Sequence, residues 1–402
     1  MKKVMTFALC IAAVGAISAQ KANVDQAKKM AGKIDKLAEA RTMIKQAINN
    51  PETSNDAGTY AVAGKIEFDA FNEGKKKLMI NQNDPSVDKV EMGRELINGF
   101  NYYMKGMPLD QLPNEKGQIK PKYTKDMAST LNSLHGDFFN YGGELYNNKH
   151  YYPDAYNAFM IYGDLPDYDW ASKDVKAVPD TTRALAYYYA GISAYSGNNL
   201  NDAVAALKKA RQHGVTDLQS YVYEIACWQN MAREDTTLVD QSKVAIQEIA
   251  KQGYDNFGIK QPLFLNSLIN TLGEDEKYDE AITLINSQLS KTPSEPVLYA
   301  LRAWIYDRKG DDENALNDYV KGASFPNADS ETLNRAARKL YNHGTELWNK
   351  IEGDPAAKQE VKTKYWQKAK EFLNRALETD PGNPDSERIM ESIDYVLDPS
   401  FR

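Results

Sequence analysis

Few side chains in this sequence have the types and the spacing that catalysis needs. The four histidines, His135, His150, His213 and His343, are far apart and show no metal-ligand spacing. Carboxylates are plentiful, but most stand in turns such as Gly310–Glu313, where acidic side chains cap helices. No two carboxylates stand out as a general acid and a general base. We therefore expect neither an enzyme nor a bound metal.

Known catalytic and cofactor motifs are also absent. The sequence contains no H-E-x-x-H, no paired C-x-x-C and no glycine-rich phosphate loop. The segment Gly191–Tyr195 approaches the G-x-S-x-G nucleophile elbow, but it lacks the second glycine and lies within a helical pattern. We interpret Gly191 as a helix-packing residue and expect no cofactor. Clustered carboxylates with raised pKa values in a closed pocket would reverse this interpretation.

The aromatic content favours recognition over reaction. The chain has 25 tyrosines and 12 phenylalanines. Tyrosine suits partly solvated surfaces, because it joins an apolar ring to a hydrogen-bonding hydroxyl group. The composition therefore indicates a binding surface.

Charge and hydropathy limit what such a surface could bind. With 49 basic and 56 acidic residues among 402, the formal charge is -7, which argues against nucleic acid as the main partner. No long apolar run follows Gln20, so we expect no transmembrane segment in the mature chain. Two cysteines are too few for a disulfide scaffold.

Residues 1–19 have the pattern of a cleaved secretory signal peptide. Lys2 and Lys3 precede a mostly apolar stretch, and small residues end this stretch at Ala19. We therefore expect a mature chain of residues 20–402 in a bacterial periplasm, with outer-membrane association as a further option.

The two cysteines bear on this prediction. A lipoprotein is the alternative to a secreted protein, but Cys10 follows Leu9, where a lipoprotein signal needs a small residue. Cys227 lies in the apolar run Ile225–Trp228, and we interpret it as a small buried hydrophobic residue.

Two stretches in the C-terminal third repeat the same pattern. Tyr278–Ile282 is followed by Asp312–Leu316, so that Ala281 corresponds to Ala315. The interval between the two alanines is the roughly 34 residues of a two-helix repeat unit. An apolar helical segment precedes each stretch, and a proline follows it. This pattern is typical of paired antiparallel helices, in which small residues allow close approach at the crossing.

On these motifs the chain resembles the tetratricopeptide repeat family, and more narrowly the secreted tetratricopeptide proteins of Bacteroidetes-type bacteria. Degenerate copies of the pattern cover most of the mature chain: Ala40, Ile44 and Ala47; Gly143, Tyr146, Ala155 and Phe159; Gly191, Ala203 and Leu207; Ala369, Leu373 and Ala376. The resemblance implies an all-α fold, a right-handed superhelical solenoid of antiparallel helix pairs.

Three segments depart from a strict repeat. Residues 105–125 contain three prolines and two glycines, so we expect a non-helical, basic insertion there. This insertion is either a contact loop or a solvated excursion. A second, polar insertion at 351–364 is expected to extend its flanking helices. Residues 385–397 show one apolar face and are expected to form a capping helix.

The resemblance also implies where partners bind, because the first helix of each pair lines the concave face in this family. Its residues there become candidate partner-binding residues: Asn140, Glu144, Asn147, Tyr188, Ile192, Tyr195, Asn266, Asn270, Trp304, Asp307, Arg308, Tyr341 and Trp348. Aromatic rings and amides at one-turn spacing suit an extended peptide or a glycan chain. The alternative for each aromatic residue is that it belongs to the core between repeats.

We therefore expect a non-catalytic scaffold of the bacterial cell envelope that holds protein or peptide partners along a groove. The alternative function is glycan binding in the periplasm or at the outer membrane. If the groove assignment is right, replacing Tyr188, Trp304 or Trp348 by alanine weakens binding with little loss of thermal stability.

Overall fold

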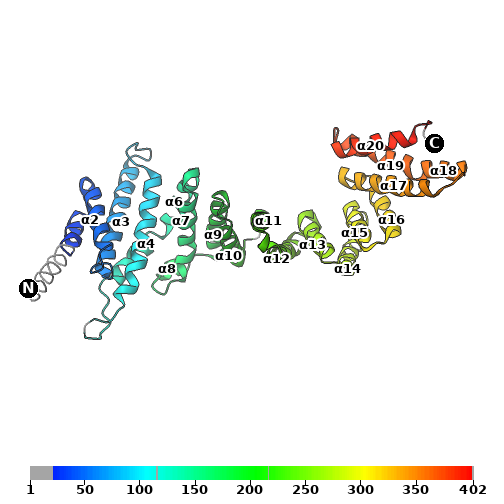
Figure 1. Cartoon of the computed structure of the whole chain (residues 1–402). Coiled ribbons are helices and arrows are strands. Elements are labelled where there is room, and N and C mark those ends of the chain that lie inside the picture. Colours follow the sequence, from blue (N-terminus) through cyan, green and yellow to red (C-terminus); the bar gives the residue numbers. More distant parts are fainter. Residues whose placement is uncertain (1–20, 115, 216, 401–402) are drawn as a thin grey trace, which may run out of the picture. The chain divides into compact units, whose positions relative to one another are not determined.

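The protein is all-α over the residues that the structure, a computed structural model, describes: 21–114, 116–215 and 217–400. Figure 1 shows a series of helices, most of which lie beside their neighbours in the chain. The chain divides into two compact units between Val239 and Asp240, here called unit 1 and unit 2. The signal peptide predicted at residues 1–19 lies outside the described residues.

Unit 1 contains the helices up to this division. Their bounds are η1 Ile34–Lys36, α2 Leu37–Ile48, α3 Ala57–Ile80, α4 Lys89–Asp110, α5 Thr124–Ser133, α6 His135–Tyr146, η2 Lys149–Tyr151, α7 Tyr152–Asp164, η3 Leu165–Asp167, α8 Lys173–Lys176, α9 Asp180–Ser196, α10 Leu200–Gln212, α11 Leu218–Glu234 and η4 Thr236–Leu238. The main antiparallel pairs are α3 with α4, α6 with α7, and α9 with α10.

Unit 2 contains the remaining helices. Their bounds are α12 Val239–Phe257, η5 Gly258–Lys260, α13 Pro262–Glu274, α14 Tyr278–Leu289, α15 Pro296–Lys309, α16 Asp312–Ser324, α17 Ser330–Lys350, α18 Pro355–Val361, the π-helix η6 Lys362–Gln367, α19 Lys368–Thr379 and α20 Pro384–Leu397. Its main pairs are α15 with α16 and α17 with α19, and α14 packs on both α13 and α15.

The small residues of the repeat pattern lie where helices cross. Ala281 in α14 and Ala315 in α16 are fully buried. Gly191 in α9 allows the close approach of α10, since a Cβ atom at this position would stand 2.6 Å from the Leu207 side chain. The predicted role of these residues in helix packing is therefore confirmed.

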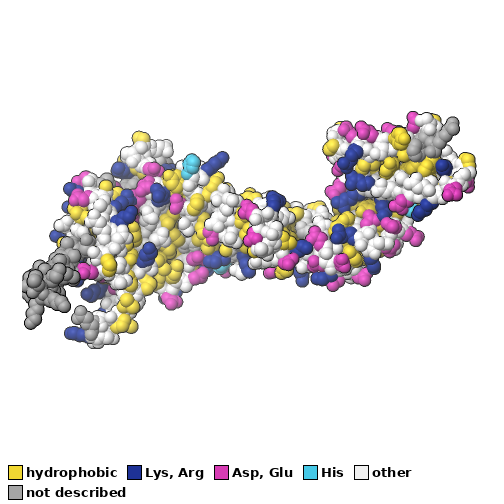
Figure 2. Space-filling model, in the orientation of Figure 1, with side chains coloured by type: hydrophobic (Ala, Val, Ile, Leu, Met, Phe, Trp, Pro, Cys, Tyr) yellow, Lys and Arg dark blue, Asp and Glu magenta, His cyan; other side chains and the backbone are white. Residues whose placement is uncertain are grey.

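Acidic residues in the turns start several helices. The side chains of Asp88, Asp311 and Asp329 accept hydrogen bonds from backbone N–H groups in the first turns of α4, α16 and α17. Such caps satisfy donors that have no partner within the helix. Figure 2 shows acidic and basic side chains interspersed over the visible face.

The first insertion is shorter than the sequence predicts. Helix α4 continues to Asp110 with Pro108 in its last turn, so the expectation of a non-helical segment from residue 105 was wrong for its first residues. A proline this close to a helix end removes only one backbone bond, and it does not stop the helix upstream. The described non-helical residues of this insertion are 111–114 and 116–123.

The second insertion lengthens a helix. After a short break at 351–354, α18, η6 and α19 follow one another without interruption over residues 355–379. Helix α20 is present close to the bounds expected for a terminal helix, and it buries Ile389, Ile393 and Val396. Among the described residues, no helix has the length and apolar content needed to cross a membrane.

Candidate functional site

Four partly exposed tyrosines lie close together on α6, α9 and α11 of unit 1. They are Tyr146, Tyr188, Tyr195 and Tyr223, and we call them the tyrosine face. The ring centroids of Tyr195 and Tyr223 are 5.1 Å apart. Tyr146 and Tyr223 both interact electrostatically with Tyr188 and contribute to its raised pKa. Three helices thus contribute rings to one surface.

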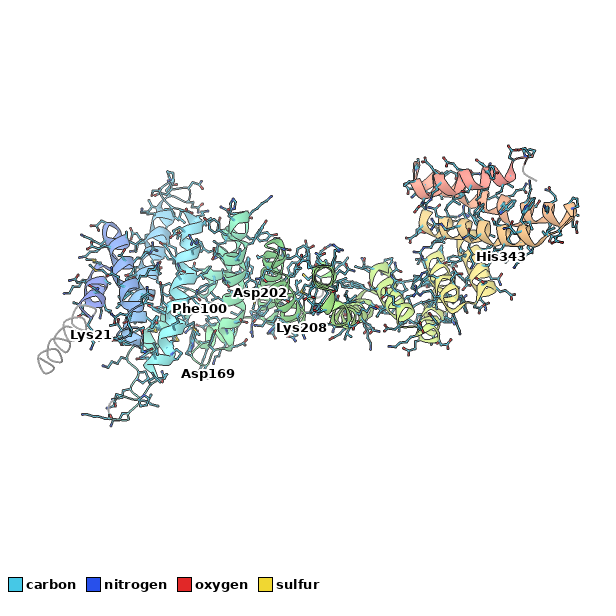
Figure 3. The ribbon with its side chains drawn as sticks, viewed as in Figure 1. Lys21, Phe100, Asp169, Asp202, Lys208 and His343 are labelled. Atoms are coloured by element: carbon cyan, nitrogen blue, oxygen red, sulfur yellow. The ribbon has the colours of Figure 1, made fainter. Side chains whose placement is uncertain are left out.

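Helix α9 supplies two of these rings because of its residue spacing. Tyr188, Ile192 and Tyr195 follow one another at intervals of four and three residues, so they share one side of the helix. Gly191 packs α9 against α10, which Asp202 and Lys208 mark in Figure 3. The structure therefore brings together the three candidates that the sequence named on α9, and it leaves each of them partly exposed.

Tyr188 stays protonated at neutral pH. Burial raises the pKa of Tyr188 to about 12, and the nearby Asp217 carboxylate adds to this effect. Asp217 is fixed as the N-cap of α11, where it accepts a hydrogen bond of 2.8 Å from the Gln219 backbone N–H. The Tyr188 hydroxyl group is therefore available as a hydrogen-bond donor.

Helix α6 carries polar candidates beside the tyrosine face. Asn140 and Asn147 are exposed, whereas Glu144 is partly exposed and pairs with Lys89 of α4 at 3.2 Å. Residues four and seven positions apart share one side of a helix, so the three side chains lie along one strip of α6. The two amides remain available to donate and accept hydrogen bonds.

Sequence reasoning missed Tyr146 and Tyr223 as site residues. Tyr146 was assigned only to the repeat pattern, and Tyr223 stands in the first helix of a pair whose copy of the motif is weak. The signal that could have found Tyr223 is its position on a first helix shortly after Asp217, the capping residue of that helix.

The corresponding candidates on α15 of unit 2 are used in packing. The indole ring of Trp304 fills the space over Gly273 of α13, where a Cβ atom would stand 2.6 Å from it. Arg308 lies over the Trp304 ring at 5.2 Å and donates a hydrogen bond of 3.2 Å to the Gly273 carbonyl oxygen. These contacts connect α15 to α13, and Trp304 remains partly exposed as Tyr188 does.

Ion pairs and packing occupy two further candidates of unit 2. Asp307 accepts a hydrogen bond of 2.5 Å from Lys339 of α17, and Lys339 also bonds Asp312 at 2.8 Å. The Tyr341 ring packs against the core, and its backbone carbonyl oxygen accepts a hydrogen bond of 3.3 Å from the Trp366 indole N–H. Both residues therefore hold helices together.

Trp348 is a core residue, contrary to its assignment to an open groove. Its side chain is only 8% exposed and packs with Trp366, Val361 and Val396. The Trp348 and Trp366 ring centroids are 5.1 Å apart. The physical reason is the insertion after α17, because α18 and η6 supply the residues that cover Trp348.

The amide candidates of α13 belong to unit 2, whereas the tyrosine face belongs to unit 1. Asn270 is exposed, whereas Asn266 is partly buried. The Oδ1 atom of Asn266 is buried and has no hydrogen-bond partner among the described residues. The two amides are described within unit 2 alone, and no aromatic cluster like that of unit 1 is formed by them there. The tyrosine face is the stronger candidate surface.

A charged cluster lies beneath a separate pocket of unit 1. Arg41 of α2 donates hydrogen bonds to Glu67 of α3 at 2.5 Å and to Glu95 of α4 at 2.9 Å. Both carboxylates are 6% exposed. Burial raises the pKa of Glu95 to about 7, and the Arg41 charge only partly opposes this effect. We call these three residues the Arg41 cluster.

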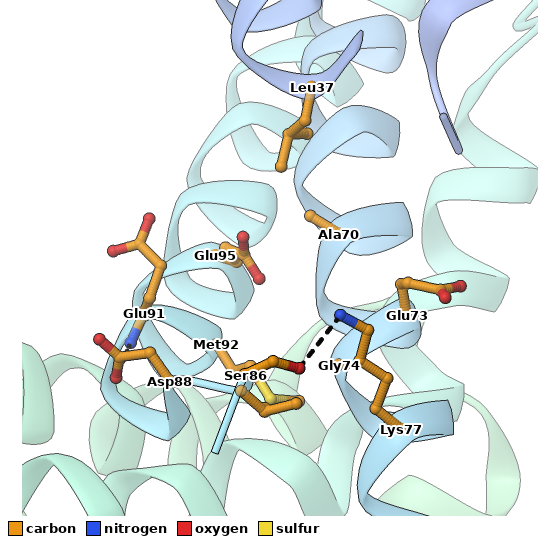
Figure 4. A pocket seen from close by; sticks show the side chains of 11 residues that line it. Leu37, Ala70, Glu73, Gly74, Lys77, Ser86, Asp88, Glu91, Met92 and Glu95 are labelled. Carbon is orange, nitrogen blue, oxygen red and sulfur yellow. Dashed lines mark hydrogen bonds between the residues drawn. The ribbon is translucent and has the colours of Figure 1, made fainter. Parts of the chain in front are cut away.

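The neighbouring pocket offers little catalytic chemistry. Its volume is about 210 Å³, and Figure 4 shows Glu91 and Glu95 on one side of it and Glu73 and Lys77 on the other. The Lys77 ammonium group bonds the Ser86 hydroxyl group at 3.5 Å. The Glu95 carboxylate already bonds Arg41, so it is not free to act on a substrate. The cluster is best explained as a contact that holds three helices together.

The described part of the chain contains no group of three histidine, cysteine or acidic side chains placed to hold a metal ion. His135 is buried, and its ring lies parallel to that of Tyr162 with centroids 4.2 Å apart. Cys227 is a free, buried thiol, as its surroundings in the sequence indicated, and burial raises its pKa to about 12. These residues serve packing.

Comparisons with known proteins found similarity of structure only. No protein-family model and no curated protein matches the chain. The structure of Naa15/Naa10 bound to HypK-THB is 12% identical, with 94% of this chain and 64% of that chain covered and a TM-score of 0.38. Yeast Tom70 is 14% identical over 94% of this chain and 88% of that chain, with a TM-score of 0.29. The P58(IPK) TPR domain is 12% identical over 94% of this chain and 98% of that chain, with a TM-score of 0.28.

This chain therefore spans less than two thirds of the length of the first of these structures. Its fold is established by its own packing, in which small residues separate successive antiparallel helices. Each unit is an array of antiparallel helix pairs.

Proposed function

We propose that the protein is a non-catalytic scaffold that binds an extended protein or peptide segment on the tyrosine face of unit 1. One observation carries this proposal: four tyrosines from three helices remain partly exposed and close together. Aromatic rings provide a large contact area at a small cost in side-chain entropy, which is why they dominate binding surfaces.

The polar groups around the rings suit a peptide backbone. The Tyr188 hydroxyl group is a donor at neutral pH, and the exposed amides of Asn140 and Asn147 can both donate and accept. An extended peptide presents a carbonyl oxygen and an N–H group in every residue that is not already paired. The tyrosine face can therefore bind an apolar side chain and the adjoining backbone together.

The setting that we propose is the bacterial cell envelope. The support is the signal-like sequence of residues 1–19, with Lys2, Lys3 and Ala19 in their expected places. The partners would then be envelope proteins or peptides.

Photocrosslinking tests the proposal without assuming a partner. We would place a photoreactive amino acid at Tyr188 and, as a matched control, at the 69% exposed Tyr395 of α20. The expected result is a discrete crosslinked protein or peptide from Tyr188 and none from Tyr395. Identical products from both positions, or none from either, would contradict the proposal.

The glycan alternative uses the same rings, because sugars also stack on tyrosine. Calorimetric titration with envelope oligosaccharides separates the two ligand classes. Saturable glycan binding that Tyr188→Ala abolishes, together with no peptide crosslink, would replace the protein scaffold by a glycan-binding protein.

A further inference from the structure

The segment between α4 and α5 exposes two large aliphatic side chains. Leu112 is 59% exposed and Ile119 is 61% exposed. Pro113 and Pro121 stand near them in the sequence and are exposed as well. We call the described residues 111–114 and 116–123 the projecting loop, because this segment extends away from the helices in Figures 1 and 3. Single exposed apolar residues are ordinary, but several on one short segment form a small apolar patch, which is a feature of interaction sites.

Lysines surround these aliphatic residues. Residues 111–125 contain Lys116, Lys120, Lys122 and Lys125 and one acid, Glu115, so the stretch carries +3 (four minus one) in a chain of net charge -7. None of the four lysines forms an ion pair with a carboxylate within the described residues. In Figure 2 blue and yellow side chains gather at this end of unit 1. The loop is therefore both apolar and locally cationic.

The projecting loop is held firmly at its base. The Asp110 carboxylate accepts hydrogen bonds from the backbone N–H groups of Lys122, Tyr123 and Thr124 at 3.0, 2.8 and 2.8 Å. Its far end turns where the Asn114 N–H donates to the Gln118 carbonyl oxygen at 2.9 Å. The end of α4 is thus connected to the start of α5, and the aliphatic residues are presented on a defined support.

An apolar pocket with an aromatic wall adjoins this base. Its volume is about 480 Å³, and Pro121, Ala128 and Trp170 contribute to its lining. The Trp170 ring stacks on Tyr168 with centroids 4.9 Å apart. Tryptophan is enriched where proteins contact the interfacial region of lipid bilayers.

We propose that the projecting loop docks the protein peripherally on an anionic lipid surface. In this arrangement Leu112 and Ile119 insert among the acyl chains near the headgroups, while the lysines pair with lipid phosphates. Exposed aliphatic residues close in sequence to lysines that form no ion pair within the described residues match this environment on both counts. A projecting tip is also small for a stable protein interface, which usually needs about 800 Å² from each partner.

The C-terminal end of α3 gives an internal comparison. Met79 and Ile80 are 83% and 89% exposed, so they are at least as available as the loop residues. However, the three lysines of Lys75–Lys77 face carboxylates. The first two form ion pairs at 2.8 and 3.4 Å, and the third helps to lower the pKa of Asp84. This end therefore exposes apolar side chains without unbalanced positive charge, and we expect it not to bind anionic lipid.

Vesicle co-sedimentation of the full chain tests the proposal. The probes are vesicles of phosphatidylcholine and phosphatidylglycerol mixed three to one, and vesicles of pure phosphatidylcholine. The variants are Lys116→Gln/Lys120→Gln/Lys122→Gln, Leu112→Asn/Ile119→Asn, and the control Met79→Asn/Ile80→Asn. All the substituted residues are exposed, and circular dichroism verifies that each variant is folded.

We expect binding to the anionic vesicles only, and its loss at high salt. Each neutralised lysine should lower the partition coefficient about fivefold, so the triple variant loses about a hundredfold. The Leu112/Ile119 variant also loses binding, whereas the Met79/Ile80 control does not. The proposal is overturned if anionic vesicles are not bound, if the loop variants bind like the unchanged protein, or if the loop captures an acidic protein and ignores lipid.

Discussion

Unit 1 and unit 2 have the same helix-pair architecture but use their first-helix aromatics differently. In unit 1, Tyr188 and Tyr195 remain partly exposed beside rings from neighbouring helices. In unit 2, Trp304 is partly exposed but fills the space over Gly273 of another helix, and Trp348 is only 8% exposed. Equivalent positions in a repeat therefore do not have equivalent roles, since the neighbours decide whether a ring is available to a ligand.

The charges show a related difference. Unit 1 buries one positive and two negative side chains together, since Arg41 pairs with both Glu67 and Glu95. In unit 2, one positive and one negative side chain, Arg302 and Asp318, form a partly buried ion pair with N–O distances of 2.6 and 2.8 Å. Burial raises the pKa of Glu95 to about 7, and the neighbouring Glu67 and Glu91 charges add to this effect, so stability near neutral pH should depend on pH through unit 1.

The largest expected effect is in the core of unit 2. Trp348→Ala should lower the free energy of unfolding by about 3–5 kcal/mol, because it leaves a cavity against Trp366. Chemical denaturation followed by circular dichroism measures this loss. Tyr395→Ala, at an exposed position, is the control and should change stability by less than about 0.5 kcal/mol. A stable Trp348→Ala variant would restore this residue to the binding surface.

Removal of Arg41 should have the next largest effect, in unit 1. Arg41→Met leaves Glu67 and Glu95 buried without their counter-charge, which should cost about 3 kcal/mol at pH 8. The loss should shrink toward pH 5, because burial raises the pKa of Glu95 to about 7 and a proton then neutralises its charge. Urea denaturation at both pH values measures the difference, and an equal loss at both would rule out the charge explanation.

The pH dependence of the unchanged protein should be opposite to that of an ordinary ion-paired carboxylate. Folded Glu95 keeps its proton up to about pH 7, whereas the unfolded chain releases it near 4.5. The folded state therefore binds more protons between these values, and its stability falls as the pH rises through this window. We expect a decrease of about 2 kcal/mol, since nearby solvent reduces the 1.36 kcal/mol that each pKa unit represents.

Glu95→Gln provides the control for this pH effect. It should remove the decline between pH 4.5 and 7 and raise the stability at pH 8, because no buried charge remains to be formed at this position. Arg41, Glu67 and Glu91 face the same site and are unchanged in this variant. A decline that persists in the variant would assign the pH dependence to another group.

A smaller effect is expected at the edge of the tyrosine face. Asn140→Ala should leave the unfolding free energy within about 0.5 kcal/mol, because its side chain is exposed. It should weaken the binding of a crosslinked partner about fivefold by removing one hydrogen bond. Isothermal titration calorimetry measures the affinity, with Asn270→Ala in unit 2 as the matched control that should bind normally.

Much of the fold was predictable, because small residues that recur at a fixed interval indicate where paired helices cross. The positions of Ala281 and Ala315, one repeat period apart, correctly predicted two helix crossings. The prediction that Pro108 stands outside a helix was wrong, because the energetic cost of a proline depends on its place in the helix. Pro108 stands in the last turn of α4. The division into two units after Val239 was not predicted from the amino-acid composition.

The candidate site was less predictable, because exposure is set by residues distant in sequence. Trp348 is covered by α18 and η6, which come after it in the chain and were expected only to extend helices. Trp304 packs on Gly273, which belongs to the preceding helix pair. Tyr188 and Tyr195 could be named from their helix alone, whereas their neighbour Tyr223 required the three-dimensional packing.

The most direct test of the central claim is a comparison of Tyr188→Ala with Trp304→Ala, using the partner that crosslinks to the tyrosine face. We predict that Tyr188→Ala weakens binding by tenfold or more, about 1.4 kcal/mol, with little loss of stability. Trp304→Ala should bind normally while losing about 3 kcal/mol of stability in unit 2. Equal losses of binding and stability in both variants, or lost binding in Trp304→Ala alone, would contradict the claim that unit 1 holds the partner.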